Sequence, residues 1–94
     1  NERRKFVLGR LKEIGLDPKY TPTAAFYVFI KYPNQDVNSL DLAKDILEKA
    51  HVALTPGIDF GQRGEGFIRL SYANSLENLD KALNSLEQYF KPYL

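Results

Sequence analysis

One arginine, Arg69, falls in the middle of a predicted strand, directly after a glycine-rich segment. Successive side chains of a strand point to opposite faces, so Arg69 shares a face with Phe67 and Ser71, whereas Ile68 and Leu70 point the other way. A guanidinium is planar and can hold a carboxylate through two parallel hydrogen bonds. Arg69 is therefore a candidate carboxylate-binding residue, although the pattern alone favours an arginine on the solvated face of a sheet.

Four glycines around this segment raise the question of a phosphate-binding loop. Gly57, Gly61, Gly64 and Gly66 have the spacing of neither the dinucleotide-binding fingerprint nor the Walker motif, and no Lys-Ser or Lys-Thr pair follows them. We therefore interpret these glycines as residues of tight turns.

The other titratable residues give no second candidate site. His51 ends a predicted helix, where an imidazole is more often a C-terminal cap than a catalytic group. Two carboxylates of the glycine-rich segment, Asp59 and Glu65, have no evident partner. Other carboxylates are expected on solvated helix faces without acid–base function, and these are Glu13, Asp41, Asp45, Glu48, Glu77 and Glu87.

Composition excludes several classes of function. The 94 residues include no cysteine and one histidine, which rules out a disulfide, a thiolate metal site and a multi-histidine metal centre. The net charge of +1, from 13 basic and 12 acidic side chains, argues against nonspecific binding to nucleic acid or an anionic membrane. No apolar run approaches the roughly 20 residues of a transmembrane helix, and no signal-peptide pattern opens the chain, so we expect a cytoplasmic protein. The chain starts at Asn1 and contains no methionine, which fits an excised piece of a longer protein.

The elements that position Arg69 are expected to form a small α+β domain. Helices are predicted at about Glu2–Ile14, at Asn38–Ala50 and after Asn74, and strands at Ala25–Tyr32, Val52–Thr55 and Phe67–Tyr72. The order α-β-α-β-β-α predicts one two-layer domain, residues 1–94, in which helices pack on a small three-stranded sheet.

Local signals predict where the helices begin and end and which faces they bury. Gly15 stops the first helix, Asn38 with Asp41 caps the second, and Asn74 with Glu77 caps the third. The predicted apolar stripes are Leu40, Ala43, Ile46, Leu47 and Ala50 in the second helix and Leu76, Leu79, Leu83, Leu86 and Phe90 in the third.

An RNA-recognition-like α+β binding module is the alternative function. Its strand motif combines basic, glycine and aromatic residues, and residues 63–70 fit several of its positions. The motif binds RNA by stacking bases on aromatic rings, and Glu65 and Leu70 stand where rings are required. The initial helix and the lack of a fourth predicted strand also fit this module poorly.

Several blocks of sequence occur in the order that one family shows. They are Arg3-Arg4 with Phe6 and Leu11, Ile14–Leu16, Pro22–Phe29, Val52–Gly57 with Phe60-Gly61, Gly64–Ala73, and Ser75–Leu79 with Ala82-Leu83. Together they resemble the C-terminal small domain of class I and II aminotransferases, which are fold-type-I enzymes, in the branch of aspartate and aromatic aminotransferases. Gly64–Ala73 is the most specific block. Ala24 departs from the glycine that is common in the family, which concerns the local backbone.

The resemblance implies a role for Arg69 and a function for the complete protein. Arg69 matches the arginine that holds the substrate α-carboxylate, on a small domain that closes over the substrate. Pyridoxal 5'-phosphate is expected on a lysine of a large domain that this chain lacks, so we expect no catalytic or cofactor-binding residue here and no activity of the chain alone. The complete enzyme would be a homodimer that transfers an amino group between an amino acid and a 2-oxo acid, with the amino acid left open.

Overall fold

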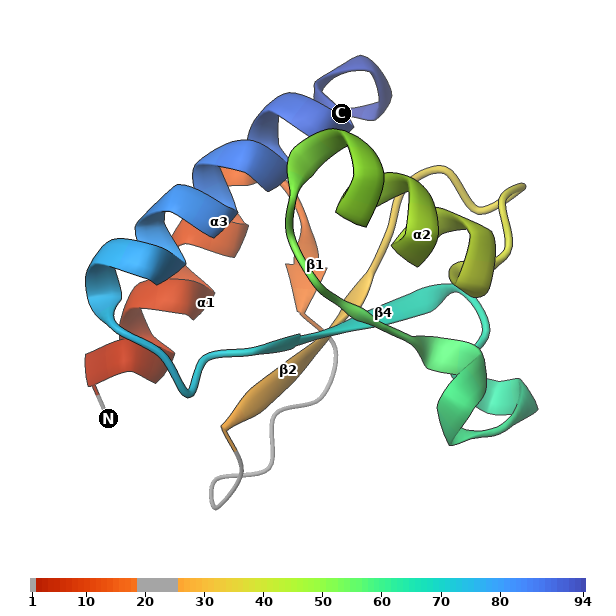
Figure 1. Ribbon diagram of the computed structural model, residues 1–94, viewed down its shortest axis with the longest axis horizontal. Coiled ribbons are helices and arrows are strands. Elements are labelled where there is room, and N and C mark those ends of the chain that lie inside the picture. The colour runs from red at the N-terminus through yellow and green to blue at the C-terminus, as the bar shows by residue number, and fades with distance from the viewer. Residues whose placement is uncertain (1, 19–25) are drawn as a thin grey trace.

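The structure is a computed structural model that describes residues 2–18 and 26–94 (Figure 1). Within them, the helices are α1 Glu2–Ile14, α2 Ser39–Ala50 and α3 Leu76–Phe90. The strands are β1 Asp17–Pro18, β2 Tyr27–Lys31, β3 Thr55–Pro56 and β4 Phe67–Ser71, and short 3-10 turns form η1 Gly57–Phe60, η2 Gln62–Gly64 and η3 Lys91–Tyr93. The predicted α+β class is confirmed. The Pro22–Ala25 part of the block noted above, including Ala24, lies outside the described residues.

The sheet has four strands in the order β1-β2-β4-β3, so the prediction of three strands was wrong. The added strand is β1, in which Asp17 and Pro18 pair antiparallel with Lys31 and Ile30. A proline lacks the N–H that a central strand needs but is tolerated at a sheet edge. Pro18 therefore predicts an extended connection from sequence, although the segment forms an edge strand. The β3 strand is also displaced from the predicted Val52–Thr55.

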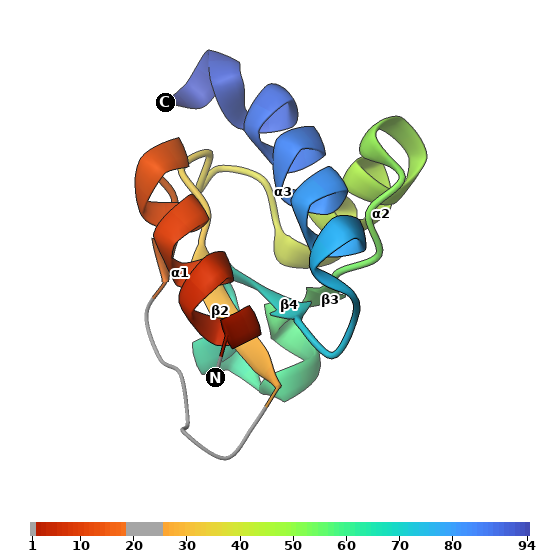
Figure 2. The same cartoon turned by 90° about the vertical axis from the view of Figure 1, so that its left-hand side faces the viewer.

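The helices cover one face of this sheet (Figure 1). Val28 and Ile30 of β2 and Ile68 and Leu70 of β4 point toward them and are buried. Each such side chain contributes roughly 1.5–3 kcal/mol relative to exposure. Helices α1 and α3 lie side by side in both views (Figures 1 and 2). Their core residues are Val7, Leu11 and Ile14 of α1 and Leu79, Leu83, Leu86 and Phe90 of α3.

The buried face of α2 differs from the predicted stripe. Leu40 and Leu47 are 43% and 52% exposed, whereas Ser39, Leu42, Ala43 and Ile46 are buried. Both sets repeat at helical spacing, because leucines occur on more than one side of this helix. The face of α2 that packs on the core therefore includes Ser39, whose polar groups form the hydrogen bonds described below.

The helix ends agree with the sequence signals except at α3. The Asn38 side chain accepts a hydrogen bond from the backbone N–H of Asp41 at 2.9 Å, as predicted. At α3 the cap is Ser75, whose hydroxyl accepts from the N–H of Asn78 at 3.1 Å, so the assignment of the cap to Asn74 with Glu77 was wrong by one residue. Asn74 instead supports Ser75, since its side chain accepts from the Ser75 N–H at 2.8 Å.

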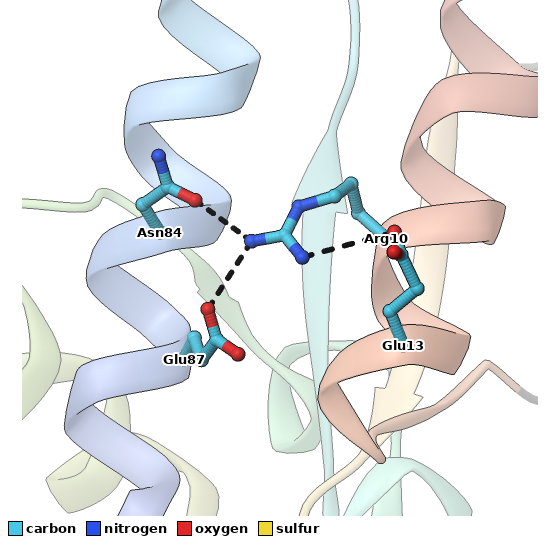
Figure 3. A network of polar contacts seen from close by, with 4 residues as sticks. All are labelled: Arg10, Glu13, Asn84 and Glu87. Carbon is cyan, nitrogen blue, oxygen red and sulfur yellow. Dashed lines mark hydrogen bonds and ion pairs between the residues drawn. The ribbon is translucent and has the colours of Figure 1, made fainter.

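Polar contacts link α3 to each of the other two helices. Arg10 of α1 donates to Asn84 of α3 at 2.7 Å and contacts the carboxylates of Glu87 and Glu13 at 3.3 and 3.8 Å (Figure 3). On the other side of α3, the Tyr89 hydroxyl donates to the Asp45 carboxylate of α2. In the described part of the chain, no helix is long and apolar enough to cross a membrane.

Candidate carboxylate-binding site

Arg69 lies on the sheet face opposite the helices, in the central part of the sheet. Strand β4 is flanked by β2 and β3, and Arg69 is paired with Phe29 on one side and Thr55 on the other. The predicted alternation of faces in this strand is confirmed, because Ile68 and Leu70 are buried in the core whereas Arg69 is only half-buried. The position of Arg69 is therefore fixed by a paired strand on each side of β4.

Two aromatic rings hold the guanidinium of Arg69. Its central carbon lies 4.7 Å from the centroid of the Tyr27 ring and 4.8 Å from that of Phe60. The Phe29 ring contacts both of these rings edge-on, with centroids 5.7 Å from Tyr27 and 5.3 Å from Phe60. A cation over an aromatic face is stabilised by the ring quadrupole, by about 0.5–2 kcal/mol. The rings thus fix the plane of the guanidinium without neutralising its charge.

The donors of Arg69 are largely unused. Its Nε is buried and has no hydrogen-bond partner among the described residues. One terminal nitrogen donates to the Thr55 hydroxyl at 3.5 Å, a long and weak contact. Within residues 2–18 and 26–94, no carboxylate forms an ion pair with Arg69. A fixed cation with free donors in a fork suits a planar anion such as a carboxylate.

The glycine-rich segment builds one wall of this site. A Cβ on Gly57 would lie 1.8 Å from the Gly64 carbonyl oxygen, so η1 and η2 pack backbone against backbone. Gly66, immediately before β4, has φ +94, a conformation that glycine adopts readily. The glycines therefore shape turns, as predicted. These turns bring Phe60 onto the guanidinium.

The other sequence candidates lie away from Arg69 or have structural partners. His51 is exposed and ends α2 in the left-handed conformation, with its backbone N–H bonded to the Leu47 carbonyl at 3.2 Å, which confirms a capping position. Asp59 is exposed. Glu65, for which the sequence showed no partner, binds Ser39 at the start of α2.

Sequence reasoning missed the residues that surround Arg69. Tyr27, Phe60 and Thr55 come from three separate segments, and no local spacing connects them to Arg69. The aromatic run of β2 predicts a strand, but it does not indicate which ring contacts Arg69. Strand pairing and the path of the glycine turns decide which of these side chains reach the guanidinium.

The described residues do not fit a covalently held pyridoxal cofactor or a metal ion. A lysine that forms a Schiff base needs a desolvated or otherwise activated site. Every described lysine is exposed, namely Lys5, Lys12, Lys31, Lys44, Lys49, Lys81 and Lys91, and Lys19 lies outside the described residues. The described part of the chain also holds no group of three or more His, Cys, Asp or Glu side chains arranged for a metal.

Comparison with known proteins identifies what the chain is similar to. The sequence model of aminotransferases of class I and II matches residues 1–86. An aspartate aminotransferase of Pyrococcus horikoshii is 45% identical over 89 residues, which cover 94% of this chain and 22% of that protein. An LL-diaminopimelate aminotransferase of Natranaerobius thermophilus is 40% identical over 90 residues, covering 95% of this chain and 22% of that protein.

Solved structures agree with the sequence comparison. The crystal structure of an aromatic aminotransferase from Pyrococcus horikoshii superposes with a TM-score of 0.86 at 38% identity, over 97% of this chain and 24% of that one. The chain thus spans less than a quarter of the length of these relatives.

The comparisons do not support the RNA-recognition module. The sheet does have a fourth strand, so the expected lack of one was wrong and does not count against that module. Glu65 does not fit the module, because its carboxylate binds Ser39 and presents no surface on which a base could stack.

Proposed function

Because this chain belongs to the aminotransferases of class I and II, we propose that it is the C-terminal small domain of an enzyme that moves an amino group between an amino acid and a 2-oxo acid. The observation that carries this proposal is the state of Arg69. Its guanidinium is held against the rings of Tyr27 and Phe60, without an ion-pair partner among the described residues. We assign it the substrate α-carboxylate, held by two parallel hydrogen bonds.

Arg69 contributes binding and orientation in this proposal, not proton transfer. Gripping the α-carboxylate fixes one end of the substrate, so that the amino group is presented in a constant place whatever the side chain. Since the guanidinium belongs to the small domain, the same contact ties that domain to bound substrate and favours closure and exclusion of water.

Class I and II aminotransferases depend on pyridoxal 5'-phosphate, which supplies an electron sink when bound. The exposed lysines of this chain do not fit its attachment. We propose that a large domain outside residues 1–94 holds the cofactor. We further propose a cytoplasmic homodimer.

The amino acid that the enzyme uses stays open in this proposal. The relatives named above include an aspartate, an aromatic and an LL-diaminopimelate aminotransferase. An α-carboxylate is common to all amino acids, so Arg69 serves each of these substrates and does not choose among them.

The test is Arg69→Lys in the full-length protein, with kcat/KM measured on several amino acids and on amines that lack the carboxylate. Lysine keeps the charge but loses the planar fork. We expect kcat/KM on every amino acid to fall roughly ten-fold to several-hundred-fold, since each hydrogen bond to a charged group contributes about 1.5–3 kcal/mol. Amines should be little affected. Wild-type efficiency on amino acids in a normally melting variant would make Arg69 a surface arginine.

A further inference from the structure

A second charged residue of the glycine-rich segment, Glu65, is bound to the N-terminus of α2. One carboxylate oxygen accepts from the backbone N–H of Ser39 at 2.5 Å, and the other accepts from the Ser39 hydroxyl at 2.9 Å. Ser39 is the first residue of α2 and is fully buried. An anion is stabilised at a helix N-terminus by the free N–H groups and the helix dipole. Glu65 therefore joins its own loop to α2 by two charge-assisted hydrogen bonds.

The Ser39 hydroxyl extends this link to η1. Its oxygen accepts from the backbone N–H of Ile58 at 3.0 Å. A serine hydroxyl has one proton to donate, and Glu65 takes it, which leaves the oxygen lone pairs aimed at Ile58. The carboxylate thus sets the orientation of the hydroxyl that holds η1.

The far end of η1 carries the ring that stacks on Arg69. Ile58 lies within Gly57–Phe60, and the Gly61 N–H closes the turn on the Ile58 carbonyl at 3.0 Å. The Phe60 ring lies 4.8 Å from the guanidinium carbon of Arg69. A shift of Ile58 would therefore be passed to Phe60 within this one short 3-10 turn.

Glu65 is also tied to the strand that carries Arg69. The next residue, Gly66, leads directly into β4, and its carbonyl accepts from the Gln35 side chain at 2.8 Å and from the Tyr32 N–H at 3.3 Å. Glu65 therefore connects η1, which it reaches through Ser39, to the start of β4, where the Gly66 carbonyl is anchored. Strand β4 carries the guanidinium of Arg69, and η1 carries Phe60, one of the rings that contact it.

From this arrangement we propose that Glu65 is a positioning residue for Arg69, acting through Ser39, Ile58 and Phe60 to hold the guanidinium in the orientation that receives a substrate carboxylate. The inference rests on the proposed function and deepens it. Glu65 does not touch the substrate, so removing its charge should weaken carboxylate recognition and leave the rest of the reaction in place.

The test compares Glu65→Gln and Ser39→Ala with Glu48→Gln, which changes an exposed glutamate of α2, in the full-length protein. Glutamine keeps the shape of Glu65 but replaces one acceptor oxygen with a donor, so it competes with Ile58 for the Ser39 hydroxyl. We expect kcat/KM on an amino acid to fall about 10-fold in both variants, as for partial loss of a charge-assisted contact. The amine that lacks only the carboxylate should react within about 2-fold of wild type. Glu48→Gln should match wild type on both.

Hydrogen–deuterium exchange gives a readout that does not depend on activity. The peptide containing Ile58 should exchange faster than in wild type in both Glu65→Gln and Ser39→Ala. Its exchange rate should equal that of wild type in Glu48→Gln. Wild-type efficiency on amino acids despite a released Ile58 amide would overturn the inference. So would an equal loss on amino acid and amine, because that indicates general damage.

Arg69→Lys, assayed in parallel, separates the two proposals. If kcat/KM falls selectively on amino acids in Arg69→Lys but not in Glu65→Gln, only the positioning role of Glu65 fails. If Arg69→Lys behaves as wild type, the assignment of the carboxylate to Arg69 fails, and the role of Glu65 fails with it.

Discussion

The ring of Phe60 lies 4.8 Å from the guanidinium carbon of Arg69, whose side chain leaves β4 on the face opposite the buried Ile68 and Leu70. Phe60 is 46% exposed, so it contributes little to the core and covers the cation instead. This contact, with the one from Tyr27, preorganises the guanidinium of Arg69 on the sheet. Preorganisation lowers the entropic cost of gripping a ligand.

The first prediction concerns this ring. Phe60→Leu in the full-length protein should lower kcat/KM on amino acids by roughly 2- to 30-fold, since a cation–π contact contributes about 0.5–2 kcal/mol. Steady-state kinetics on an amino acid and on the matching amine would measure the effect. Phe26→Leu is the control, because Phe26 is similarly exposed, at 51%, and contacts Tyr72 instead. Equal kinetics for the two variants would contradict a role for Phe60.

A second prediction concerns the cofactor. The isolated 94-residue chain should give no saturable, stoichiometric absorbance band when it is titrated with pyridoxal 5'-phosphate, because its described lysines are all exposed. Slow, nonstoichiometric reaction with surface lysines is the expected background. The full-length protein serves as the positive control. A band that saturates at one cofactor per isolated chain would mean that this domain contains the attachment site.

A third prediction tests the close approach of the two turns. Gly57→Ala should destabilise the isolated chain by about 1–3 kcal/mol or more, because the added Cβ would meet the Gly64 oxygen at 1.8 Å and the Phe67 oxygen at 2.5 Å. Gly9→Ala is the matched control. Nothing lies within 4 Å of a Cβ on Gly9, in the middle of α1, and alanine should stabilise a helix there by roughly 0.5–1 kcal/mol. Urea unfolding would measure both, and Gly57→Ala at wild-type stability would contradict the packing.

The position of Arg69 on the sheet could be predicted because it depends on local pattern alone. Alternation within Phe67–Ser71 fixes which side chains share its face, and hydrophobicity fixes which face is buried. The cap at Asn38 could also be predicted from local pattern, because its side chain accepts from the N–H of Asp41, only three residues away. The cap of α3 lies one residue later than predicted because Asn74 and Ser75 are both good capping residues, and the Ser75 hydroxyl accepts the cap hydrogen bond from Asn78.

The surroundings of Arg69 could not be predicted because they depend on contacts between distant segments. Thr55 and Tyr27 reach it through strand pairing, and Phe60 reaches it through a turn whose shape depends on the approach of Gly57 to Gly64. Glu65 and Ser39 are likewise far apart in sequence. A single sequence contains the signals for each element but not the register in which the elements meet.

The last prediction concerns pH and the link between α2 and α3. The hydrogen bond from the Tyr89 hydroxyl, and then the ion pair with Lys49 at 3.1 Å, lower the pKa of Asp45 below its ordinary value. A carboxyl with a lowered folded-state pKa stabilises the fold above its unfolded-state pKa, and that contribution is lost as pH falls through the folded-state value. Wild type should therefore be more stable than Tyr89→Phe at neutral pH, and the difference should shrink below about pH 4.

The tyrosine gives the opposite dependence at high pH. Burial, and then the hydrogen bond to Asp45, raise the pKa of Tyr89. The folded state therefore holds the phenol proton more tightly than the unfolded state, and wild type should lose stability relative to Tyr89→Phe above about pH 10, where the unfolded tyrosine ionises. Urea unfolding of the isolated chain across this pH range measures both limbs. Tyr93→Phe, which changes an exposed tyrosine of η3, should follow wild type in the acid limb. A stability difference between wild type and Tyr89→Phe that stayed constant from pH 3 to pH 7 would mean that Asp45 does not accept this hydrogen bond as a carboxylate.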